Sequence, residues 1–363
     1  MQINFENINN SVVLLRADLN ESLTTSGEMF GTARLDASIS TMQELLGRKN
    51  KVIVISHHSD ESQSLAPIAS YLKKSFAHME FVQSLEISEI KNKIQNTNSS
   101  LILLENLRMF GGEEKWEEAN NQSFAESLAK LGEYFVYDAF SVAHRSHASV
   151  VSVSKYLPHT LGPISRREEE KLKKLYDSEK GLLIIMGGAK LSTKLPIITH
   201  FLNSGARVFL GGAMAHPILK RRGLDIKNSL TEEISLTDEI VNHPNLLLPI
   251  DYVWENKGDI ERILDAGKES VLILSAEINK AENIMYNGPI GMYEIPGFEF
   301  GTKSLLENLS DLEKFVVVGG GDTLSAIEKL MPKFTCSYIS LSGGAMLEFL
   351  AKGTLVGIEA NKN

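Results

Sequence analysis

The stretch FVVVGGGDTLSAIEKL, residues 315–330, decides the fold class of this chain. A short β-branched run leads into three glycines, and an acid, a hydroxyl residue and an apolar helical pattern follow. This order predicts a strand, a tight turn and a helix start, because glycine lets the backbone turn sharply. Main-chain N–H groups at a helix N-terminus attract anions, and an Asp beside a phosphate is a usual ligand of magnesium. We therefore expect nucleotide phosphates and a metal at residues 319–323.

The same order recurs three more times in the second half of the chain. Apolar runs that end in paired glycines begin at Leu182, Val208 and Tyr338. Parallel sheets bind ligands at the carboxyl ends of their strands, so four such units predict one shared crevice. The alternative is that these glycines serve only the packing of helices on strands.

Composition narrows the classes of function. The 363 residues favour two domains, and 43% hydrophobic residues suffice for two cores. A net charge of −9 without a long basic tract argues against nucleic acid or an anionic membrane as partner. The single Cys336 excludes an internal disulfide framework and fits a reducing compartment. With no signal-peptide pattern and no apolar run as long as a membrane span, we expect a cytoplasmic protein.

The first half alternates strand-like runs with helical patterns, which predicts a parallel sheet with helices on both faces. The candidate strands are residues 12–15, 52–55, 101–104 and 134–137. Polar residues follow each strand, and we expect them to gather at one edge of the sheet. They are Asp18 and Asn20, then His57 and His58, then Glu105, Asn106 and Arg108, and finally Asp138, His144, Arg145 and His147.

Several arginines in one crevice of an acidic protein predict a small anionic substrate, since guanidinium binds carboxylate or phosphate in a fork. Arg34, Arg108 and Arg145 are the main candidates. The alternative is that each arginine caps a helix or pairs with a surface carboxylate. For His58 and His147 a structural hydrogen bond is the simpler interpretation.

The second half adds cations and a turn. The charged run SRREEEKLKKLYDSEK, from Ser165, predicts a helix that connects two domains. Lys190 and Lys194 follow a glycine pair at a predicted helix start, and their spacing predicts one helix face suited to phosphoryl transfer. NGPIG, from Asn287, predicts a rigid turn, and Glu294 beyond it could accept hydrogen bonds from a ribose. The chain has no GxGxxG, P-loop, HExxH or CxxC motif.

In their order, these motifs resemble the phosphoglycerate kinase family nearly end to end. They are RADLN (from Arg16), SLAPIA (Ser64), LLENLRMFGGEEK (Leu103), DAFSVAHRSHAS (Asp138), GGAKLSTKL (Gly187), GGAMA (Gly211), NGPIGMYE (Asn287), GGGDT (Gly319) and GGAMLEFL (Gly343). The resemblance implies two doubly wound, Rossmann-like α/β domains that face each other across a hinged cleft. Residues 1–155 would hold 3-phosphoglycerate, 156–180 would form the interdomain helix, 181–345 would bind nucleotide, and 346–363 would return to the N-terminal domain.

The resemblance also implies reversible phosphoryl transfer between ATP and the carboxylate of 3-phosphoglycerate, with Mg²⁺, in glycolysis, by a monomer. The substrate would be held by Asp18, Asn20, Arg34, His57, Arg108 and Arg145. The catalytic groups would be Arg34, Lys190, Gly320 and Gly343. The nucleotide would contact Gly188, Ala189, Lys190, Lys194, Gly212, Asn287, Pro289, Glu294, Gly320, Gly321, Asp322 and Thr323, and Asp322 would carry the metal.

A carboxylate nucleophile is ionised at neutral pH, its reference pKa being about 4, so this reaction needs no general base. Catalysis would rest on alignment and on charge stabilisation by Arg34, Lys190 and the glycine amides. With the two substrates on separate domains, we expect a hinge closure.

Two departures from the family bear on substrate choice. The family's Ser-His-Leu-Gly-Arg-Pro reads SHHSDE here, residues 56–61, so a phosphate-binding arginine is missing. A charge-assisted hydrogen bond contributes roughly 1.5–3 kcal/mol, and its loss could weaken phosphate binding on the order of 10- to 100-fold. SAEINKAEN, from Ser275, stands before NGP where the family has Asp-Ile-Gly-Pro, which predicts an altered adenine pocket. Two alternatives stay open, a paralogue that phosphorylates another carboxylate and a catalytically weak nucleotide-binding protein.

Overall fold

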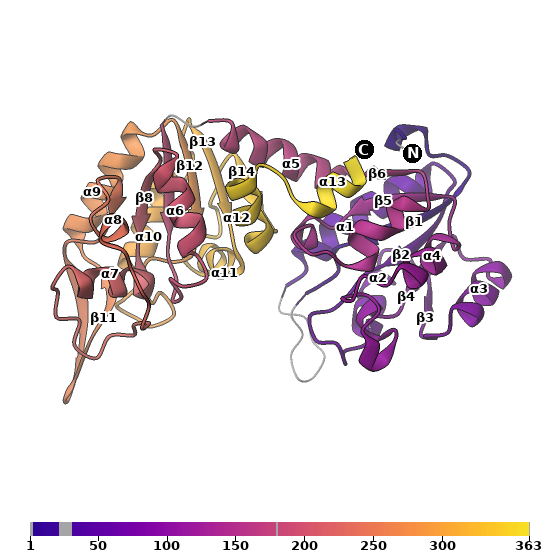
Figure 1. Ribbon diagram of the computed structural model, residues 1–363, viewed down its shortest axis with the longest axis horizontal. Coiled ribbons are helices and arrows are strands. Elements are labelled where there is room, and N and C mark those ends of the chain that lie inside the picture. The colour runs from indigo at the N-terminus through magenta and orange to yellow at the C-terminus, as the bar shows by residue number, and fades with distance from the viewer. Residues whose placement is uncertain (1–2, 22–30, 179–180, 363) are drawn as a thin grey trace. The chain divides into compact units, whose positions relative to one another are not determined.

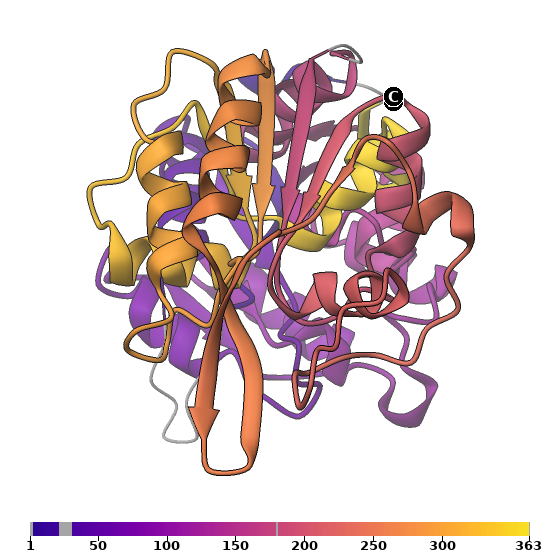
Figure 2. The same ribbon diagram turned by 90° about the vertical axis from the view of Figure 1, so that its left-hand side faces the viewer.

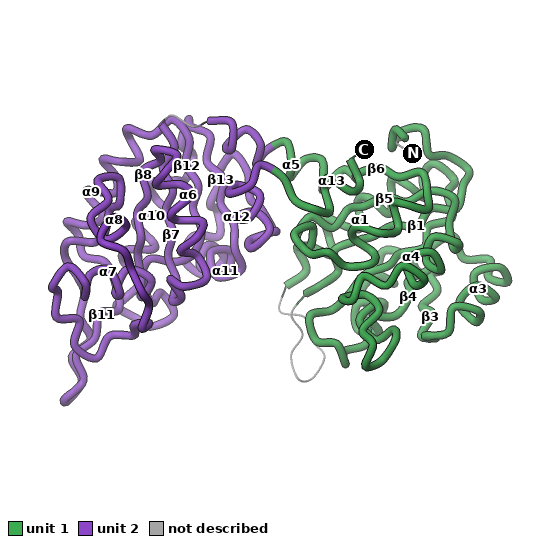
Figure 3. Tube along the Cα trace, viewed as in Figure 1, with its two compact units in different colours: residues 1–170, 354–363 green, residues 171–353 purple. Residues whose placement is uncertain are grey.

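The computed structural model describes residues 3–21, 31–178 and 181–362, so the last residues of the predicted segments 156–180 and 346–363 lie outside it. The chain divides into two compact units (Figure 3). Unit 1 comprises Met1–Glu170 and Thr354–Asn363, and unit 2 comprises Lys171–Gly353. Each unit is built on a six-stranded sheet in which all strands are parallel. The predicted fold class, two doubly wound α/β units, is confirmed.

The sheet of unit 1 has the strand order β3-β4-β2-β1-β5-β6 (Figure 1). Its strands are β1 Val12–Ala17, β2 Lys51–Ile55, β3 Glu80–Val82, β4 Leu101–Leu104, β5 Tyr134–Asp138 and β6 His159–Leu161. Its helices are α1 Ala33–Gly47, α2 Ala66–Leu72, α3 Ile87–Asn96, α4 Gln122–Ala129 and α13 Val356–Lys362. Helix α5, Pro163–Tyr176, contains the boundary between the units. The four strands predicted from apolar runs are all present.

Residues of β1 alternate between the two faces of this sheet, as a strand requires. Val13 and Leu15 are buried in a core cluster with residues of α1 and α2. Arg16 has the opposite orientation and hydrogen-bonds Ser149 in the turn Ala148–Ser152, against which α4 and α13 pack. The carboxyl end of β1 therefore carries a cation into the interior.

The C-terminal helix α13 is tied to unit 1 by buried polar contacts. Asn361 Nδ2 donates hydrogen bonds to Val150 O and to Gly357 O, both over 2.7 Å. The main-chain N–H of Gly357 donates to Ala143 O, also over 2.7 Å. A Cβ atom on Gly357 would lie 2.7 Å from Val150 Cγ1, so the helix approaches this closely only because that residue is glycine.

The sheet of unit 2 has the strand order β14-β13-β12-β7-β8-β9. Its strands are β7 Leu182–Met186, β8 Arg207–Leu210, β9 Leu246–Leu247, β12 Asn283–Asn287, β13 Phe315–Gly319 and β14 Tyr338–Ser340. Its helices are α6 Leu195–Asn203, α7 His216–Arg221, α8 Asp238–Val241, α9 Lys268–Lys280, α10 Phe300–Leu309, α11 Gly321–Leu330 and α12 Gly343–Lys352. The antiparallel hairpin of β10 Tyr252–Lys257 and β11 Ile260–Ala266 projects from this unit (Figure 2).

Helices cover both faces of this second sheet. Apolar residues of α9, α10 and α11 share one core cluster with β12 and β13, while α6 and α12 pack on each other. Within the described residues, no helix combines the length and apolarity needed to cross a membrane.

We predict that Asn361→Ala lowers the free energy of unfolding of unit 1 by about 1–3 kcal/mol, because the buried Val150 carbonyl loses its donor. Urea unfolding followed by circular dichroism measures this. The neighbouring Lys362→Ala is the matched control, since Lys362 is exposed and pairs with Glu169, and an exposed ion pair contributes little to stability. Equal effects of the two substitutions would contradict the anchoring role of Asn361.

Candidate active site

The base of the candidate substrate site in unit 1 is a buried arginine. Arg16 has no exposed surface, and its Nε donates a hydrogen bond to Ser149 Oγ over 2.9 Å. Its Nη2 lies 2.6 Å from His57 Nδ1. Because a guanidinium only donates, His57 Nδ1 must accept, and the proton of the neutral ring sits on Nε2.

His57 Nε2 is buried and has no hydrogen-bond partner among the described residues. Burial in the first place, and then Arg16, Arg108 and Arg145, hold the pKa of His57 well below its usual range. The neutral ring thus presents an N–H donor without an acceptor, which is costly in a folded protein. A bound anion would supply that acceptor.

Two further arginines surround this donor. Arg108 follows β4, and its Nε forms an ion pair with Glu118 Oε1 over 2.6 Å. Arg145 follows β5, and burial together with the charge of Arg108 lowers the pKa of its guanidinium. Like charges held close together repel each other, and such a site favours a multiply charged anion.

A buried carboxylate balances part of this charge. Glu117 accepts hydrogen bonds from the Ser149 main-chain N over 3.0 Å and from Ser149 Oγ over 2.5 Å. Ser149 Oγ in turn accepts from Arg16, so a single hydroxyl links the two charges. Burial raises the pKa of Glu117, and the charge of Arg16 opposes that rise.

His147 lies beside the same carboxylate, with its Nδ1 3.8 Å from Glu117 Oε1. Burial is the largest influence on its ring, followed by Arg16 and Arg145, and together they lower the pKa of His147 to about 3. His147 is therefore neutral at pH 7.

Three predicted substrate residues meet at the start of α1. Arg34 Nε lies 3.5 Å from Asp18 Oδ2, and Arg34 Nη1 donates to Asn20 O over 2.5 Å. Asn20 Oδ1 also accepts from the main-chain N–H of Ser59 over 2.8 Å. The loops after β1 and β2 are thereby joined at the carboxyl edge of the sheet.

Two of the acids at this edge, Glu105 and Asp138, accept hydrogen bonds from helix N-termini. Glu105 accepts a hydrogen bond from the main-chain N–H of Leu65 over 2.8 Å, just before α2. Asp138 accepts from Thr41 Oγ1 over 2.6 Å and from the main-chain N–H of Ser165, in the first turn of α5, over 2.8 Å. Both acids lie at the carboxyl ends of their strands, as predicted. Their carboxylates accept hydrogen bonds from N–H groups at helix N-termini, which need acceptors.

Sequence reasoning did not select Arg16, Glu117 or Ser149 as site residues. Glu117 stands in an acidic stretch that resembles a solvated surface. Arg16 had a recognisable signal, since it ends the otherwise apolar strand VVLLRA of a sheet that is covered on both faces.

Unit 2 contains a cavity of about 540 Å³ at the carboxyl ends of its strands. It is lined by predicted nucleotide residues from the segments that follow four strands, β7, β8, β12 and β13. These residues are Gly188, Ala189, Gly212, Pro289, Glu294 and Asp322. These segments approach so closely that side chains would collide. A Cβ atom on Gly187 would lie 2.1 Å from Pro289 O, and one on Gly212 would lie 3.0 Å from Gly188 O. The paired glycines are therefore required for the cavity to form.

The N-termini of α11 and α12 meet at glycines. Gly320 has φ +100°, and a Cβ atom on Gly343 would lie 3.1 Å from Gly320 Cα. The free N–H groups of two helices are thus brought together, an arrangement that attracts anions. Thr323 Oγ1 accepts a hydrogen bond from the Gly288 main-chain N–H over 2.7 Å, and Asn287 Nδ2 donates to Gly319 O over 2.7 Å. These bonds fix the NGP turn against the glycine turn.

Lys190 and Lys194 do not share a helix face, so that prediction was wrong. Helix α6 begins at Leu195 with Pro196 in its first turn, because proline is accepted only there. Lys194 is the residue before the helix, and burial lowers the pKa of its ammonium group. Lys190 lies in the preceding loop and is exposed.

Comparison with known proteins identifies the family. The family model for phosphoglycerate kinase matches residues 3–353. The chain is 32% identical to the phosphoglycerate kinase of Pseudothermotoga lettingae, over 97% of this chain and 96% of that protein. It is 34% identical to the phosphoglycerate kinase of Gloeobacter violaceus, over 96% of this chain and 94% of that protein. The chain belongs to the phosphoglycerate kinase family.

Solved structures of the family have the same fold. The phosphoglycerate kinase of Pyrococcus horikoshii superposes with a TM-score of 0.86 at 27% identity, and that of Coxiella burnetii with 0.81 at 28%. Each comparison covers 99% of this chain and 98% of the other. The chain is accordingly a kinase of glycolysis that phosphorylates a carboxylate, as the sequence predicted.

The loop that lacks the family's arginine is held by main-chain contacts. Arg108 Nη1 donates to Ser59 O over 2.6 Å, and Asn106 Nδ2 donates to Asp60 O over 3.2 Å. His58 accepts from the Asp60 N–H through Nδ1, so its Nε2 donates to Glu21 O, and both contacts measure 3.1 Å. This bears out the structural interpretation of His58.

The altered segment before NGP does not shape the cavity. SAEINKAEN, residues 275–283, belongs to α9, to the short connection after it and to the first residue of β12, and none of it lines the cavity. The lining instead includes Leu264, Asp265 and Ala266 at the end of β11. The predicted link between this segment and an altered adenine pocket stays a prediction, since the segment lies on a helix and a connection outside this cavity.

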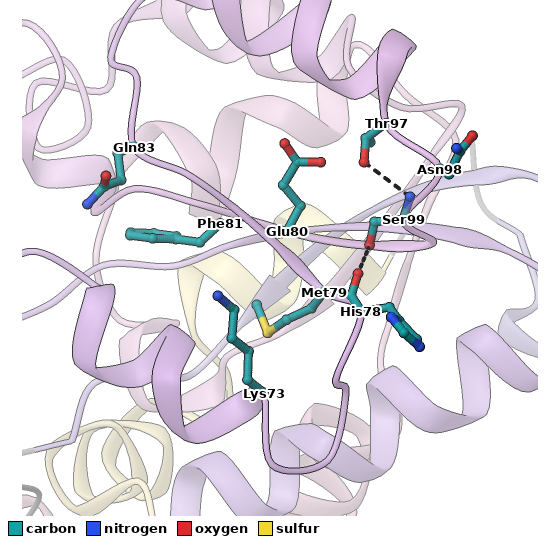
Figure 4. A pocket seen from close by; sticks show the side chains of 9 residues that line it. All are labelled: Lys73, His78, Met79, Glu80, Phe81, Gln83, Thr97, Asn98 and Ser99. Carbon is teal, nitrogen blue, oxygen red and sulfur yellow. Dashed lines mark hydrogen bonds between the residues drawn. The ribbon is translucent and has the colours of Figure 1, made fainter.

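A second hollow lies in unit 1 beside the edge strand β3 (Figure 4). Ser99 Oγ donates to His78 O over 2.7 Å, and the Ser99 N–H donates to Thr97 Oγ1 over 3.1 Å. These contacts hold the connection between α3 and β4. None of the predicted site residues lines this hollow.

We predict that acid destabilises the protein partly through His147. A folded pKa of about 3 against an ordinary 6.5 means that the unfolded chain binds the proton more strongly between these values. Stability present above pH 6.5 is therefore lost as the pH falls through that window. His147→Gln should reduce the fall in unfolding temperature between pH 7.5 and pH 5. A His147 ring that titrates near pH 6.5 in NMR spectra would contradict this.

Proposed function

We propose that this chain catalyses reversible phosphoryl transfer between ATP and the carboxylate of 3-phosphoglycerate, giving 1,3-bisphosphoglycerate and ADP. The observation that carries the proposal is the unsatisfied His57 Nε2–H, surrounded by arginines at one end of a parallel sheet. Unit 1 would hold the substrate through Asp18, Asn20, Arg34, His57, Arg108 and Arg145. His57, Arg108 and Arg145 would bind its phosphate, and Arg34 would lie against its carboxylate.

The acceptor carboxylate would attack the γ-phosphorus while the bond to the ADP oxygen breaks, and no proton moves. This chain's residues would therefore supply charge and alignment only. Arg34, Lys190 and the N–H groups at Gly320 and Gly343 would stabilise the transferring phosphoryl group. Exposure of Lys190 in a loop is compatible with a side chain that follows the group.

The glycine-lined cavity of unit 2 would bind ATP or ADP, with Glu294 at the ribose. Asp322 lines the cavity in the first turn of α11 and would carry Mg²⁺. Among the described residues no three His, Cys, Asp or Glu side chains gather into a metal cluster. A single carboxylate fits Mg²⁺, which is usually held by one or two carboxylates together with substrate phosphates. The ion would neutralise charge on those phosphates.

Two other interpretations are weaker. A paralogue with another carboxylate substrate is motivated by Ser59, Asp60 and Glu61, which replace the family's arginine, and by the pairing of Glu61 with Lys115 over 2.9 Å. A weak nucleotide-binding protein would not need the whole cluster around His57. The family match favours the enzyme. We also propose a monomer in the cytoplasm.

We propose a hinge closure that brings Arg34 and Lys190 together, since substrate and nucleotide would bind to separate units. Small-angle scattering should then show a smaller radius of gyration with both ligands than with either alone. An unchanged radius with both sites saturated would contradict closure.

We predict that Arg145→Leu raises the KM for 3-phosphoglycerate about 10- to 100-fold, because a charge-assisted contact to phosphate is lost. The KM for ATP should stay unchanged, since the nucleotide would occupy unit 2. Steady-state kinetics with each substrate varied in turn measures both values.

Arg166→Leu is the matched control for that experiment. Arg166 lies on α5 and contacts Thr160 and Glu6, away from the arginine cluster. An equal rise in both KM values for Arg145→Leu, or the same effect in the control, would count against the assignment.

A further inference from the structure

A histidine stands in the wall of the unit 2 cavity. His216 begins α7, directly after the GGAMA turn, and it lines the same cavity as Gly188, Gly212 and Asp322. Only 3% of its surface is exposed. No part of the mechanism above uses it.

The hydrogen bond of one ring nitrogen settles what the other can do. His216 Nδ1 lies 2.6 Å from Leu230 O, and a carbonyl oxygen can only accept, so Nδ1 carries a proton and donates. Burial lowers the pKa of His216, which keeps the ring neutral at pH 7. In a neutral ring with its proton on Nδ1, Nε2 has a lone pair and can only accept.

The rest of this wall suits a flat apolar group. Leu219, Leu264 and Ile290 line the cavity together with Leu230 and Met292. Leu230 is 63% exposed and Met292 is 46% exposed, so large apolar side chains face solvent at a hollow. A ligand with apolar faces and a polar edge would cover them. A purine base has that form.

We propose that His216 Nε2 accepts a hydrogen bond from the exocyclic amine of adenine and so selects adenine over 6-oxopurine nucleotides. The inference rests on the proposed function, because it takes this cavity as the nucleotide site. A 6-oxopurine presents an acceptor oxygen where adenine presents the amine. Two acceptors facing each other leave both unsatisfied, which a site built for a donor rejects.

The wild-type protein alone tests the inference, with three nucleoside diphosphates whose bases differ at the 6-position and, for inosine, also by a proton on N1. Calorimetry on the full chain should find ADP about 3- to 10-fold tighter than purine riboside diphosphate, which lacks the amine. Inosine diphosphate, with its 6-oxygen, should bind about 10- to 100-fold more weakly than ADP.

Substitution of the histidine should abolish this ranking. In His216→Phe, which keeps an aromatic ring but has no acceptor, ADP and purine riboside diphosphate should bind within about 2-fold of each other. His200→Phe is the matched control, because His200 is an exposed residue of α6 outside the cavity, and it should keep the wild-type ratio. Circular dichroism of both variants checks that they fold.

The outcomes distinguish the role of His216 from the proposed binding of nucleotide in this cavity. Equal affinity of the wild type for ADP and purine riboside diphosphate would overturn the role of His216 while leaving the cavity as a nucleotide site. The role of His216 would also be overturned if His216→Phe kept the wild-type ratio of the affinities for ADP and purine riboside diphosphate. Absence of ADP binding to the wild type would overturn the proposed function itself.

Discussion

The hydrogen bonds of the buried Arg16 organise the candidate substrate site of unit 1. A guanidinium without exposed surface needs hydrogen-bond acceptors and a nearby negative charge, since an unpaired buried charge is costly. Ser149 and the carboxylate of Glu117 behind it supply part of the compensation. His57 supplies an acceptor at Nδ1 and is thereby left with an unsatisfied donor at Nε2. The buried ion network thus leaves an unpaired N–H donor at the candidate substrate site.

The same logic explains why the C-terminal helix matters to this site. Ser149 and Val150 belong to one short turn, and Asn361 of α13 donates to the Val150 carbonyl. The chain end therefore holds the turn that positions Arg16 from behind. In unit 2 the corresponding constraint is steric, because Gly187, Gly212 and Gly343 permit contacts that any side chain would prevent. One half is built on charge balance and the other on close backbone approach.

Much of this could be predicted from local pattern. Apolar runs of four or five residues followed by glycines or polar residues indicated the strands correctly, since β-branched runs in a doubly wound fold have few alternatives. The GGGDT and NGPIG turns were also predicted, because glycine and proline mark sharp turns in a sequence. The partners of individual side chains depended on longer-range contacts and could not be predicted. Glu105 and Asp138 have the same sequence setting as Asp18, yet helix N-termini from other segments bind their carboxylates.

The residues that were missed share one property. Arg16, Glu117 and His216 are buried ionisable side chains, and tertiary neighbours such as Ser149 and the Leu230 carbonyl define their hydrogen bonding. Lys190 and Lys194 failed for a local reason, because Pro196 delays the start of α6. Because proline is favoured in the first turn of a helix, Pro196 indicates a helix that begins after both lysines.

The most direct test of the account is coupled turnover of the purified chain with magnesium-ATP while 3-phosphoglycerate is varied from micromolar to tens of millimolar. The account predicts turnover that saturates within this range, because His57, Arg108 and Arg145 would bind the phosphate without the family's additional arginine. The variant Lys190→Ala, which lacks a proposed catalytic group, gives the background rate of the assay. Absence of turnover above that background, with ADP still bound, would contradict the assignment of 3-phosphoglycerate as the substrate.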